Sequence, residues 1–225
     1  MRDDIIRFLV EDIGDGDVTA SIFIPEGDGT ASIVCESEAV VAGLEEARDV
    51  FSALGVDSQL ISRDGDRVTA GTVVMSVHGP VRSIVTGERT ALNMLMRMSG
   101  IATETARLMS IIRKRDPEMV VAGTRKTTPG FRFYEKKAIA LGGGWPHRSG
   151  LYDMIMVKDN HIAACGGMDA ALEKMCEIPP GIKVDVEVSC IEEGLKAARH
   201  GADIIMADHM SPEDTRKLRD LVREI

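Results

Sequence analysis

The pattern of hydrophobic and polar positions changes at residue 118. Before that point, three segments have strand character: 30–41, 56–62 and 71–77. Helical patterns cover four further segments: 1–12, 44–55, 81–100 and 101–115. Gly55 is placed to end the second of these helices, and Pro80 to open the third. Residues 1–112 are therefore predicted to form a small domain of mixed helices and strands, with long helices at its end.

From residue 118 onward, short apolar runs alternate with helical segments. The runs are 119–123, 154–158, 183–188 and 203–208. The helices are expected at 132–141, 167–177, 190–200 and 211–224. Nearly continuous apolar strands that alternate with helices are typical of a parallel sheet buried on both faces. We therefore predict a second, α/β domain over residues 113–225.

Charged residues stand at the ends of these four apolar runs. Arg125 and Lys126 follow the first run, and Lys158 ends the second. Glu187 lies near the end of the third run, and Asp208 ends the fourth. The carboxyl ends of parallel strands meet at one edge, which is the catalytic face in a β/α barrel. The pattern therefore predicts a functional site at that edge.

The distribution of charge indicates the kind of ligand. The chain has a net charge of −9 and a pI near 5.1, which argues against nucleic acid or an anionic membrane surface as a partner. Yet residues 123–161 carry seven Lys and Arg against three acids. Such a local basic segment favours a small ligand that carries more than one negative charge. We expect no membrane span, because no apolar run has the required length.

The four cysteines show neither a CxxC pair nor the spacing of a zinc site. We therefore expect small, buried, unpaired side chains in a reducing compartment such as the cytoplasm.

Cations in the basic segment are suited to binding carboxylates or phosphates. Arginine binds such groups with a planar fork, and lysine adds a compact charge. The candidates are Arg125, Lys126, His147, Arg148 and Lys158. For His147, the roles of general acid and of neutral hydrogen-bond donor are equally compatible with the sequence.

The two acids, Glu187 and Asp208, have several possible roles. Their carboxylates are suited to coordinating Mg²⁺, accepting hydrogen bonds from sugar hydroxyls or stabilising an oxocarbenium ion. Salt bridges to the basic segment are the simpler interpretation. The sequence alone does not choose between these roles.

Six segments together closely resemble the quinolinate phosphoribosyltransferase family, also called nicotinate-nucleotide pyrophosphorylases. They are EDIGDGDVTA (11–20), GERTALNMLMRMSGIAT (87–103), GTRKTTPGFRFYEKKAIALGGG (123–144), HRSGLYDMIMVKDNHI (147–162), VDVEV (184–188) and GADIIMADHMSPE (201–213). They stand in the family's order and cover nearly the whole chain. The resemblance implies an α/β fold: an N-terminal sandwich domain followed by an incomplete, TIM-like β/α barrel.

The resemblance also implies a reaction. The family, a group of glycosyltransferases, joins quinolinate to phosphoribosyl pyrophosphate (PRPP) and requires Mg²⁺. The products are nicotinate mononucleotide, pyrophosphate and CO₂, in NAD biosynthesis. Members act as homodimers or as assemblies built from dimers.

Matching the motifs residue by residue implies a set of roles. The quinolinate carboxylates would meet Arg125, His147, Arg148 and Lys158, with Thr124 beside them. Lys126 would lie near both substrates and act in catalysis, together with Glu187 and Asp208. Those two acids would face the ribose, Mg²⁺ and pyrophosphate. Arg89 would reach in from the partner subunit, although by itself it reads as an ordinary charge on a helix surface.

Departures from the family pattern keep alternatives open. ADH stands at 207–209 where LDN is usual, and Pro146 stands where Asn is common. We also expect the family's later β/α units, which bind the 5-phosphate of PRPP, to be missing from these 225 residues. The alternatives are therefore a related protein with another anionic ligand, or a homologue without catalytic activity.

Overall fold

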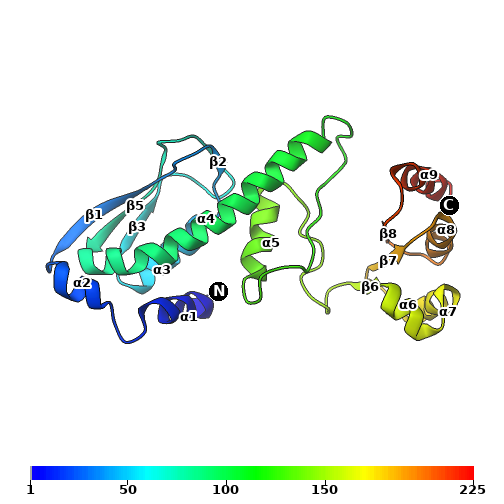
Figure 1. The fold of residues 1–225 in the computed structure, drawn as a ribbon, viewed down its shortest axis with the longest axis horizontal. Helices are drawn as coiled ribbons and strands as arrows, with labels where there is room; N and C mark the ends of the chain where they lie inside the picture. Colours follow the sequence, from blue (N-terminus) through cyan, green and yellow to red (C-terminus); the bar gives the residue numbers. More distant parts are fainter. Residues whose placement is uncertain (1) are drawn as a thin grey trace. The chain divides into compact units, whose positions relative to one another are not determined.

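The computed structural model describes residues 2–225, which form two compact units. The first extends to His147 and the second runs from Arg148 to Ile225 (Figure 1). This division lies beyond the expected boundary at 112/113, because the segment after it packs back onto a helix of the first unit. The expected boundary coincides instead with the end of that helix, α4 (Val81–Ile112).

The first unit contains a three-stranded antiparallel sheet. Its order is β1 (Asp28–Val34), β5 (Val73–Pro80), β3 (Asp57–Leu60). The predicted strand at 30–41 is in fact two strands. The register of β1 shifts after Ile33, and β2 (Ala39–Val40) pairs separately with β4 (Arg67–Val68). Val34 still pairs with Val73 beyond this bulge, and β1 ends there, before the chain enters the second, two-stranded sheet.

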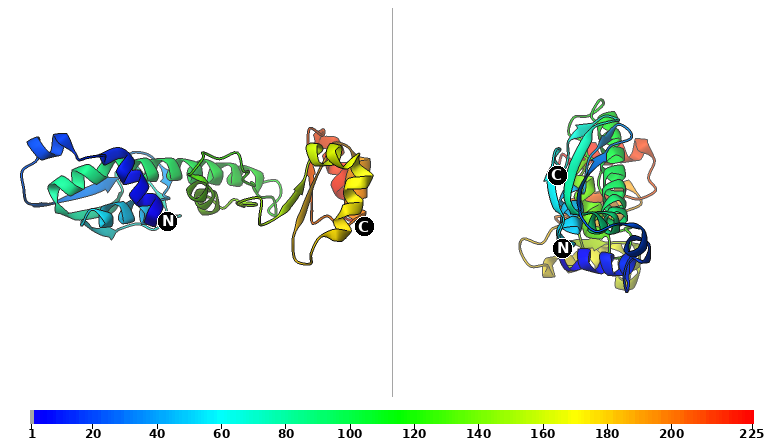
Figure 2. Two further views of the ribbon diagram at one scale, coloured as in Figure 1. Left: turned by 90° about the horizontal axis from the view of Figure 1, so that it is seen from below. Right: turned by 90° about the vertical axis from the view of Figure 1, so that its left-hand side faces the viewer.

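Helices α3 (Leu44–Ala53) and α4 lie side by side and both pack against the three-stranded sheet (Figure 2). Phe51, Met75 and Met98 lie in the core between them. The two helices expected at 81–100 and 101–115 are one continuous helix, α4. Gly100 does not interrupt it, because a single glycine costs only about 1 kcal/mol and buried residues on either side hold the helix in place.

The N-terminal helices complete the first unit. α1 (Arg2–Ile13) confirms the expected amphipathic helix. α2 (Val18–Phe23) was not expected; Asp17 caps it by accepting hydrogen bonds from the amides of Thr19 and Ala20 at 3.0 and 2.8 Å.

Helix α5 (Arg132–Leu141) packs against α4 through glycines that follow its end. A Cβ on Gly142 would lie 2.5 Å from the carbonyl oxygen of Ala102 and 2.6 Å from the Cβ of Thr105. A Cβ on Gly144 would lie 2.8 Å from the Cγ2 of Thr105. Only Gly143, with a φ of 83°, uses the conformational freedom of glycine. The GGG motif therefore serves mainly for close approach.

The second unit is a parallel sheet with the order β6 (Ile155–Val157), β7 (Val184–Val188), β8 (Ile204–Ala207). Its helical segments are α6 (Asp159–Cys165), α7 (Met168–Glu173), the 3-10 turn η1 (Lys174–Glu177), α8 (Ile191–Arg199) and α9 (Pro212–Val222). Leu172, Val186 and Leu218 form the centre of its core. The three later apolar runs are thus confirmed as parallel strands.

The first apolar run, 119–123, is not a strand. It forms one isolated parallel bridge, between Ala122 and Trp145. The chain turns at Gly142 and Gly143, shortly before Trp145.

Two further expectations concern the chain as a whole. No helix among residues 2–225 is both long and apolar enough to cross a membrane. The four cysteines are unpaired, as expected, but they are half-buried or exposed rather than buried.

Candidate functional site

The predicted site residues divide between the two units. The first unit carries Arg89, Thr124, Arg125, Lys126 and His147, and the second carries Arg148, Lys158, Glu187 and Asp208.

In the first unit, the bridge between Ala122 and Trp145 brings the segment that carries Arg125 next to the segment that carries His147. Gly123 donates its amide to the carbonyl of Trp145 at 2.8 Å, and Trp145 donates to the carbonyl of Val121 at 2.9 Å. Because the bridge is parallel, both segments leave it in the same direction. Arg125 follows one side of the bridge and His147 the other, so both lie shortly beyond the same end.

Local hydrogen bonds shape the loop that carries Arg125 and Lys126. The amide of Lys126 donates to the hydroxyl of Thr124 at 3.0 Å, which makes a tight turn. Arg132, at the start of α5, donates its Nε to the hydroxyl of Thr127 at 2.9 Å. Lys126 is exposed, whereas Arg125 is half-buried and its Nε has no hydrogen-bond partner among the described residues. A buried guanidinium nitrogen without a partner suits an anionic ligand.

Three consecutive charged residues of α5 face inward rather than toward a ligand. Glu135 and Lys136 are buried, and Lys137 is four-fifths buried. Lys136 donates to the carbonyl of Pro146, the residue before His147. The local positive charge counted in the sequence therefore overstates what a ligand meets, since these two lysines have structural partners.

Lys137 occupies a cluster of three carboxylates. Its Nζ lies 2.7 Å from Glu45, 2.9 Å from Glu46 and 3.4 Å from Asp64. Burial lowers the pKa of Lys137, but the hydrogen bonds that it donates to the two glutamates outweigh this effect and raise the pKa overall. These carboxylates have the spacing of a metal site, but they serve here as counterions that fix α5 to α3.

His147 has an unusual backbone. Its φ of 57° lies in the left-handed region, which non-glycine residues seldom adopt. Its ring packs edge-on against Trp145, with the ring centroids 4.6 Å apart. Histidine is among the non-glycine residues that adopt this region most often.

In the second unit, the predicted residues line one edge of the parallel sheet. Lys158 directly follows β6, Glu187 is the penultimate residue of β7, and Asp208 directly follows β8. The Nζ of Lys158 lies 3.3 Å from a carboxylate oxygen of Glu187. The expected gathering of charge at the carboxyl edge is thus confirmed for these three strands.

Arg148 is 8% exposed and donates to the carbonyl of Met154 at 3.5 Å. A second buried charge, Asp185, was missed from the sequence. It is fully buried and lies two residues before Glu187 on the same face of β7. The alternation in VDVEV was the available signal, because an acid two residues from a predicted site acid shares its side of the strand.

Asp208 keeps an accessible carboxylate, since its side chain is 49% exposed. The neighbouring His209 has its Nε2 3.7 Å from this carboxylate. The φ of His209 is 52°. Asn, Asp and His are the non-glycine residues most often found in the left-handed region. The backbone at position 209 can therefore accept His in place of the Asn that is usual in the LDN motif.

Arg89 is exposed on α4 and has no ion-pair partner within residues 2–225.

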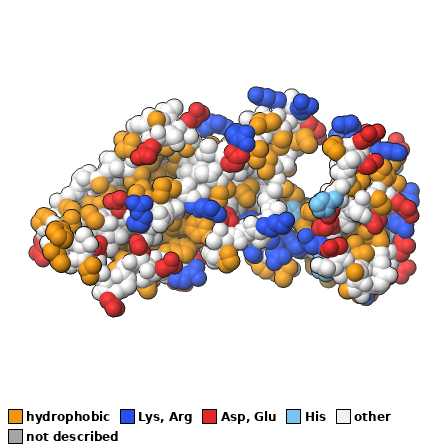
Figure 3. Space-filling model, in the orientation of Figure 1, with side chains coloured by type: hydrophobic (Ala, Val, Ile, Leu, Met, Phe, Trp, Pro, Cys, Tyr) orange, Lys and Arg blue, Asp and Glu red, His pale blue; other side chains and the backbone are white. Residues whose placement is uncertain are grey.

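Apolar side chains gather over α2, at the left of Figure 3. Val18, Ile22 and Phe23 are each about three-quarters exposed there.

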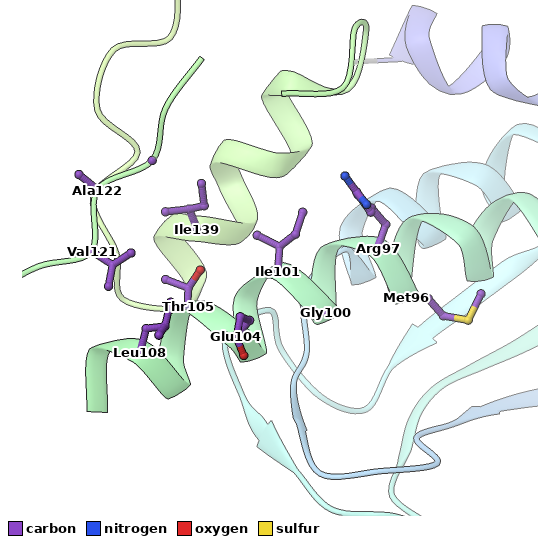
Figure 4. Close-up of a pocket in the computed structure, with 11 residues that line it drawn as sticks. Met96, Arg97, Gly100, Ile101, Glu104, Thr105, Leu108, Val121, Ala122 and Ile139 are labelled. Atoms are coloured by element: carbon purple, nitrogen blue, oxygen red, sulfur yellow. The ribbon is translucent and has the colours of Figure 1, made fainter. Parts of the chain in front are cut away.

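Two cavities lie in the first unit. One, of about 530 Å³, is bordered by α4, residues 121–123 and Ile139 of α5 (Figure 4). The other, of about 730 Å³, is bordered by α1, α4 and the loop 128–131. Neither is lined by Arg125, Lys126 or His147.

Comparison with known proteins gives consistent matches along the chain. Quinolinate phosphoribosyl transferase, N-terminal domain, matches residues 17–99, and its C-terminal domain matches residues 101–225. A probable nicotinate-nucleotide pyrophosphorylase [carboxylating] of Archaeoglobus fulgidus is 45% identical over 198 residues, which are 88% of this chain and 75% of that protein. The Bacillus subtilis protein of the same name is 41% identical over 218 residues, 96% of this chain and 75% of that protein. The solved nicotinate-nucleotide pyrophosphorylase from Francisella tularensis has a TM-score of 0.92 at 35% identity, and the match covers 100% of this chain and 81% of that one.

Proposed function

Because the chain belongs to the quinolinate phosphoribosyltransferase family, we propose that it is a carboxylating nicotinate-nucleotide pyrophosphorylase. It transfers the phosphoribosyl group of PRPP to quinolinate and releases pyrophosphate and CO₂. The observation that carries this proposal is the arrangement of Lys158, Glu187 and Asp208 along the carboxyl edge of the parallel sheet. That edge is where β/α folds perform their chemistry.

Cations bind the pyridine dicarboxylate. The Arg125 guanidinium, with its unpartnered Nε, and Arg148 are suited to bidentate contacts with carboxylates. Lys158 adds a compact charge, and Thr124 and His147 add hydrogen-bonding groups. Lys126, which is exposed and next to Arg125 in the sequence, contacts both substrates.

The acids face the ribose and the pyrophosphate. Carboxylate oxygens are the protein ligands that Mg²⁺ prefers, and the ion is usually held by one or two of them together with substrate phosphates. The accessible carboxylate of Asp208 fits that role. The Glu187 carboxylate already forms an ion pair with Lys158, so it helps to hold the ion either directly or through a bridging water. When bound there, Mg²⁺ would supply positive charge that stabilises the departing pyrophosphate.

The residues of the chain account for the remaining steps. The bond between ribose C1 and the pyrophosphate oxygen breaks, and the Glu187 carboxylate stabilises the positive charge that develops on the ring. The pyridine nitrogen forms the new bond to C1. The resulting cationic ring withdraws electrons from C2, which loses CO₂ and takes up a proton from solvent or a nearby acid. The cations that hold the other carboxylate keep the ring oriented throughout.

The assembly is a homodimer, or a larger assembly of dimers, in which Arg89 enters the partner's site. Arg89 is exposed without an ion-pair partner in the described part of the chain, and the three apolar side chains of α2 offer a surface to bury. We place the protein in the cytoplasm, where its four free cysteines remain reduced.

The test is release of CO₂ from quinolinate labelled in its 2-carboxylate. Release is expected only when PRPP and Mg²⁺ are both present. Quinolinate binding without any release under these conditions would exclude the proposed activity and favour a binding protein instead.

A further inference from the structure

Glu135 is a buried carboxylate of α5 that reaches back to the loop after Arg125 and Lys126. It is 6% exposed. One carboxylate oxygen accepts from the hydroxyl of Thr128 at 2.9 Å, and the other accepts from the Thr128 amide at 3.2 Å. Both polar groups of Thr128 that can donate are therefore bound by one side chain.

Arg97 completes this contact from α4. Its Nη2 lies 2.6 Å from Glu135 and 3.2 Å from the hydroxyl of Thr128. Figure 4 shows Arg97 extending from α4 on the side of α5. Two helices of the core thus hold one residue of the loop, through a closed triangle of contacts.

Thr128 lies two residues after Lys126, in a segment without regular secondary structure. Unanchored loops of this kind sample many conformations, and ordering each residue costs about 1–2 kcal/mol. An anchor at Thr128, together with the bridge at Ala122, fixes the segment at both ends. The backbone that carries Arg125 and Lys126 is then ordered before a ligand arrives.

We propose that Glu135, supported by Arg97, is a positioning residue that holds Arg125 and Lys126 in the geometry required for quinolinate. The inference rests on the proposed function. Glu135 touches no substrate in this account and acts only through Thr128. A misplacement of about 1 Å in a binding group can cost on the order of 100-fold in rate, so the effect of losing the anchor is measurable.

The test compares Glu135→Gln with Glu104→Gln. The control is closely matched, because Glu104 also lies 2.6 Å from an arginine, Arg107, but on the exposed surface of α4. Glutamine retains the shape of Glu135 but replaces one acceptor oxygen with a donor. For Glu135→Gln we expect kcat/KM for quinolinate to fall about 10- to 100-fold. The KM for quinolinate, which Arg125 and Lys126 both contact, should rise more than the KM for PRPP, which only Lys126 of the two contacts. Glu104→Gln should match the wild type.

A second pair of variants tests the route through Thr128. Thr128→Val removes the hydroxyl and should reproduce part of the Glu135→Gln effect, whereas Thr128→Ser retains it and should remain close to the wild type. Combining Glu135→Gln with Thr128→Val should cost less than the sum of the two changes, because they break the same contact.

Amide hydrogen exchange of residues 124–130 gives a readout that needs no substrate. Exchange should be faster in Glu135→Gln and unchanged in Glu104→Gln. Wild-type kinetics in folded Glu135→Gln, or unchanged exchange in this loop, would overturn the inference while leaving the proposed function intact. Absence of turnover in the wild type would instead refute the proposed function, and the anchoring would then be judged by exchange and by quinolinate titration of the same variants.

Discussion

The Nζ of Lys158 lies 3.3 Å from a carboxylate oxygen of Glu187, across the neighbouring strands β6 and β7. The lysine side chain is 40% exposed and the glutamate 15%. A pair with this much access to solvent adds little to stability, typically about 0–1 kcal/mol. It does place a cation and an anion side by side, and the proposed reaction uses the first to bind a carboxylate and the second to stabilise a developing positive charge.

We expect Lys158 to contribute to substrate binding rather than to the stability of the fold. Lys158→Met should lower kcat/KM for quinolinate by about 10- to 100-fold, which corresponds to one charge-assisted hydrogen bond of about 1.5–3 kcal/mol. Its free energy of unfolding should change by less than about 1 kcal/mol. The measurements are steady-state kinetics and urea unfolding.

Lys183→Met is the matched control, because Lys183 is exposed just before β7, at the opposite edge of the same sheet. It should leave both measurements unchanged. Equal loss of activity in the two variants would argue against a site at the carboxyl edge.

The cluster around Lys137 should behave in the opposite way, with its main effect on stability. Lys137→Met leaves the fully buried Glu46 without its cation, and breaking such a pair costs about 3–5 kcal/mol. The pKa of Lys137 is raised, so its contribution is complete below the ordinary lysine value of 10.5 and is lost only at higher pH. Urea unfolding at pH 6 and pH 9 should therefore give the same difference from the wild type. Lys114→Met, at an exposed position, is expected to change the unfolding free energy by less than about 0.5 kcal/mol.

Acid should weaken the anchor at Glu135. Burial raises the pKa of Glu135, but hydrogen bonds from Arg97 and Thr128 outweigh it and bring the pKa below the ordinary value of 4.5. The ionised form therefore stabilises the fold above pH 4.5, and this contribution is lost as the pH falls through the lowered value. Thermal unfolding between pH 3 and 7 should show a smaller acid-induced loss in Glu135→Gln. A pH profile parallel to that of the wild type would contradict this assignment, and Glu118→Gln, at an exposed site, provides the reference.

Gly142 is closely packed and Gly100 is not, so their substitution by alanine should have opposite effects on stability. Gly142→Ala places a Cβ 2.5 Å from the carbonyl oxygen of Ala102 and should destabilise the fold by about 1–3 kcal/mol. Gly100→Ala, in the exposed face of α4 with no atom within 4 Å, should stabilise it by about 0.5–1 kcal/mol. Thermal unfolding distinguishes the two, and a neutral result for Gly142→Ala would show that the contact between α4 and α5 can relax.

Local signals in the sequence correctly predicted several elements. Ser211, the first residue of the helix expected at 211–224, caps α9 by accepting from the amide of Asp214 at 3.0 Å. Gly201 follows α8 with a φ of 84°. The apolar runs that became β6, β7 and β8 also placed Lys158, Glu187 and Asp208 correctly at one edge. These features depend on neighbours in the sequence, where the pattern carries the information.

Contacts between distant residues could not be predicted in the same way. Arg97 and Glu135 are 38 residues apart, and both look like surface charges on their own helices. The run 119–123 has the composition of a strand, but only Trp145 is available to pair with it. In both cases the contact forms because α5 packs back against α4. A local sequence pattern carries no information about this packing.

The contact of Gly142 and Gly144 with Thr105 also has an evolutionary consequence. A Cβ at either glycine would also meet a backbone carbonyl oxygen, that of Ala102 at 2.5 Å for Gly142 and that of Val121 at 2.9 Å for Gly144. A smaller residue at 105 would therefore not make room for a larger one at 142 or 144. We expect both glycines to be retained among relatives wherever α4 and α5 cross in this way, even where the overall similarity of two sequences is low.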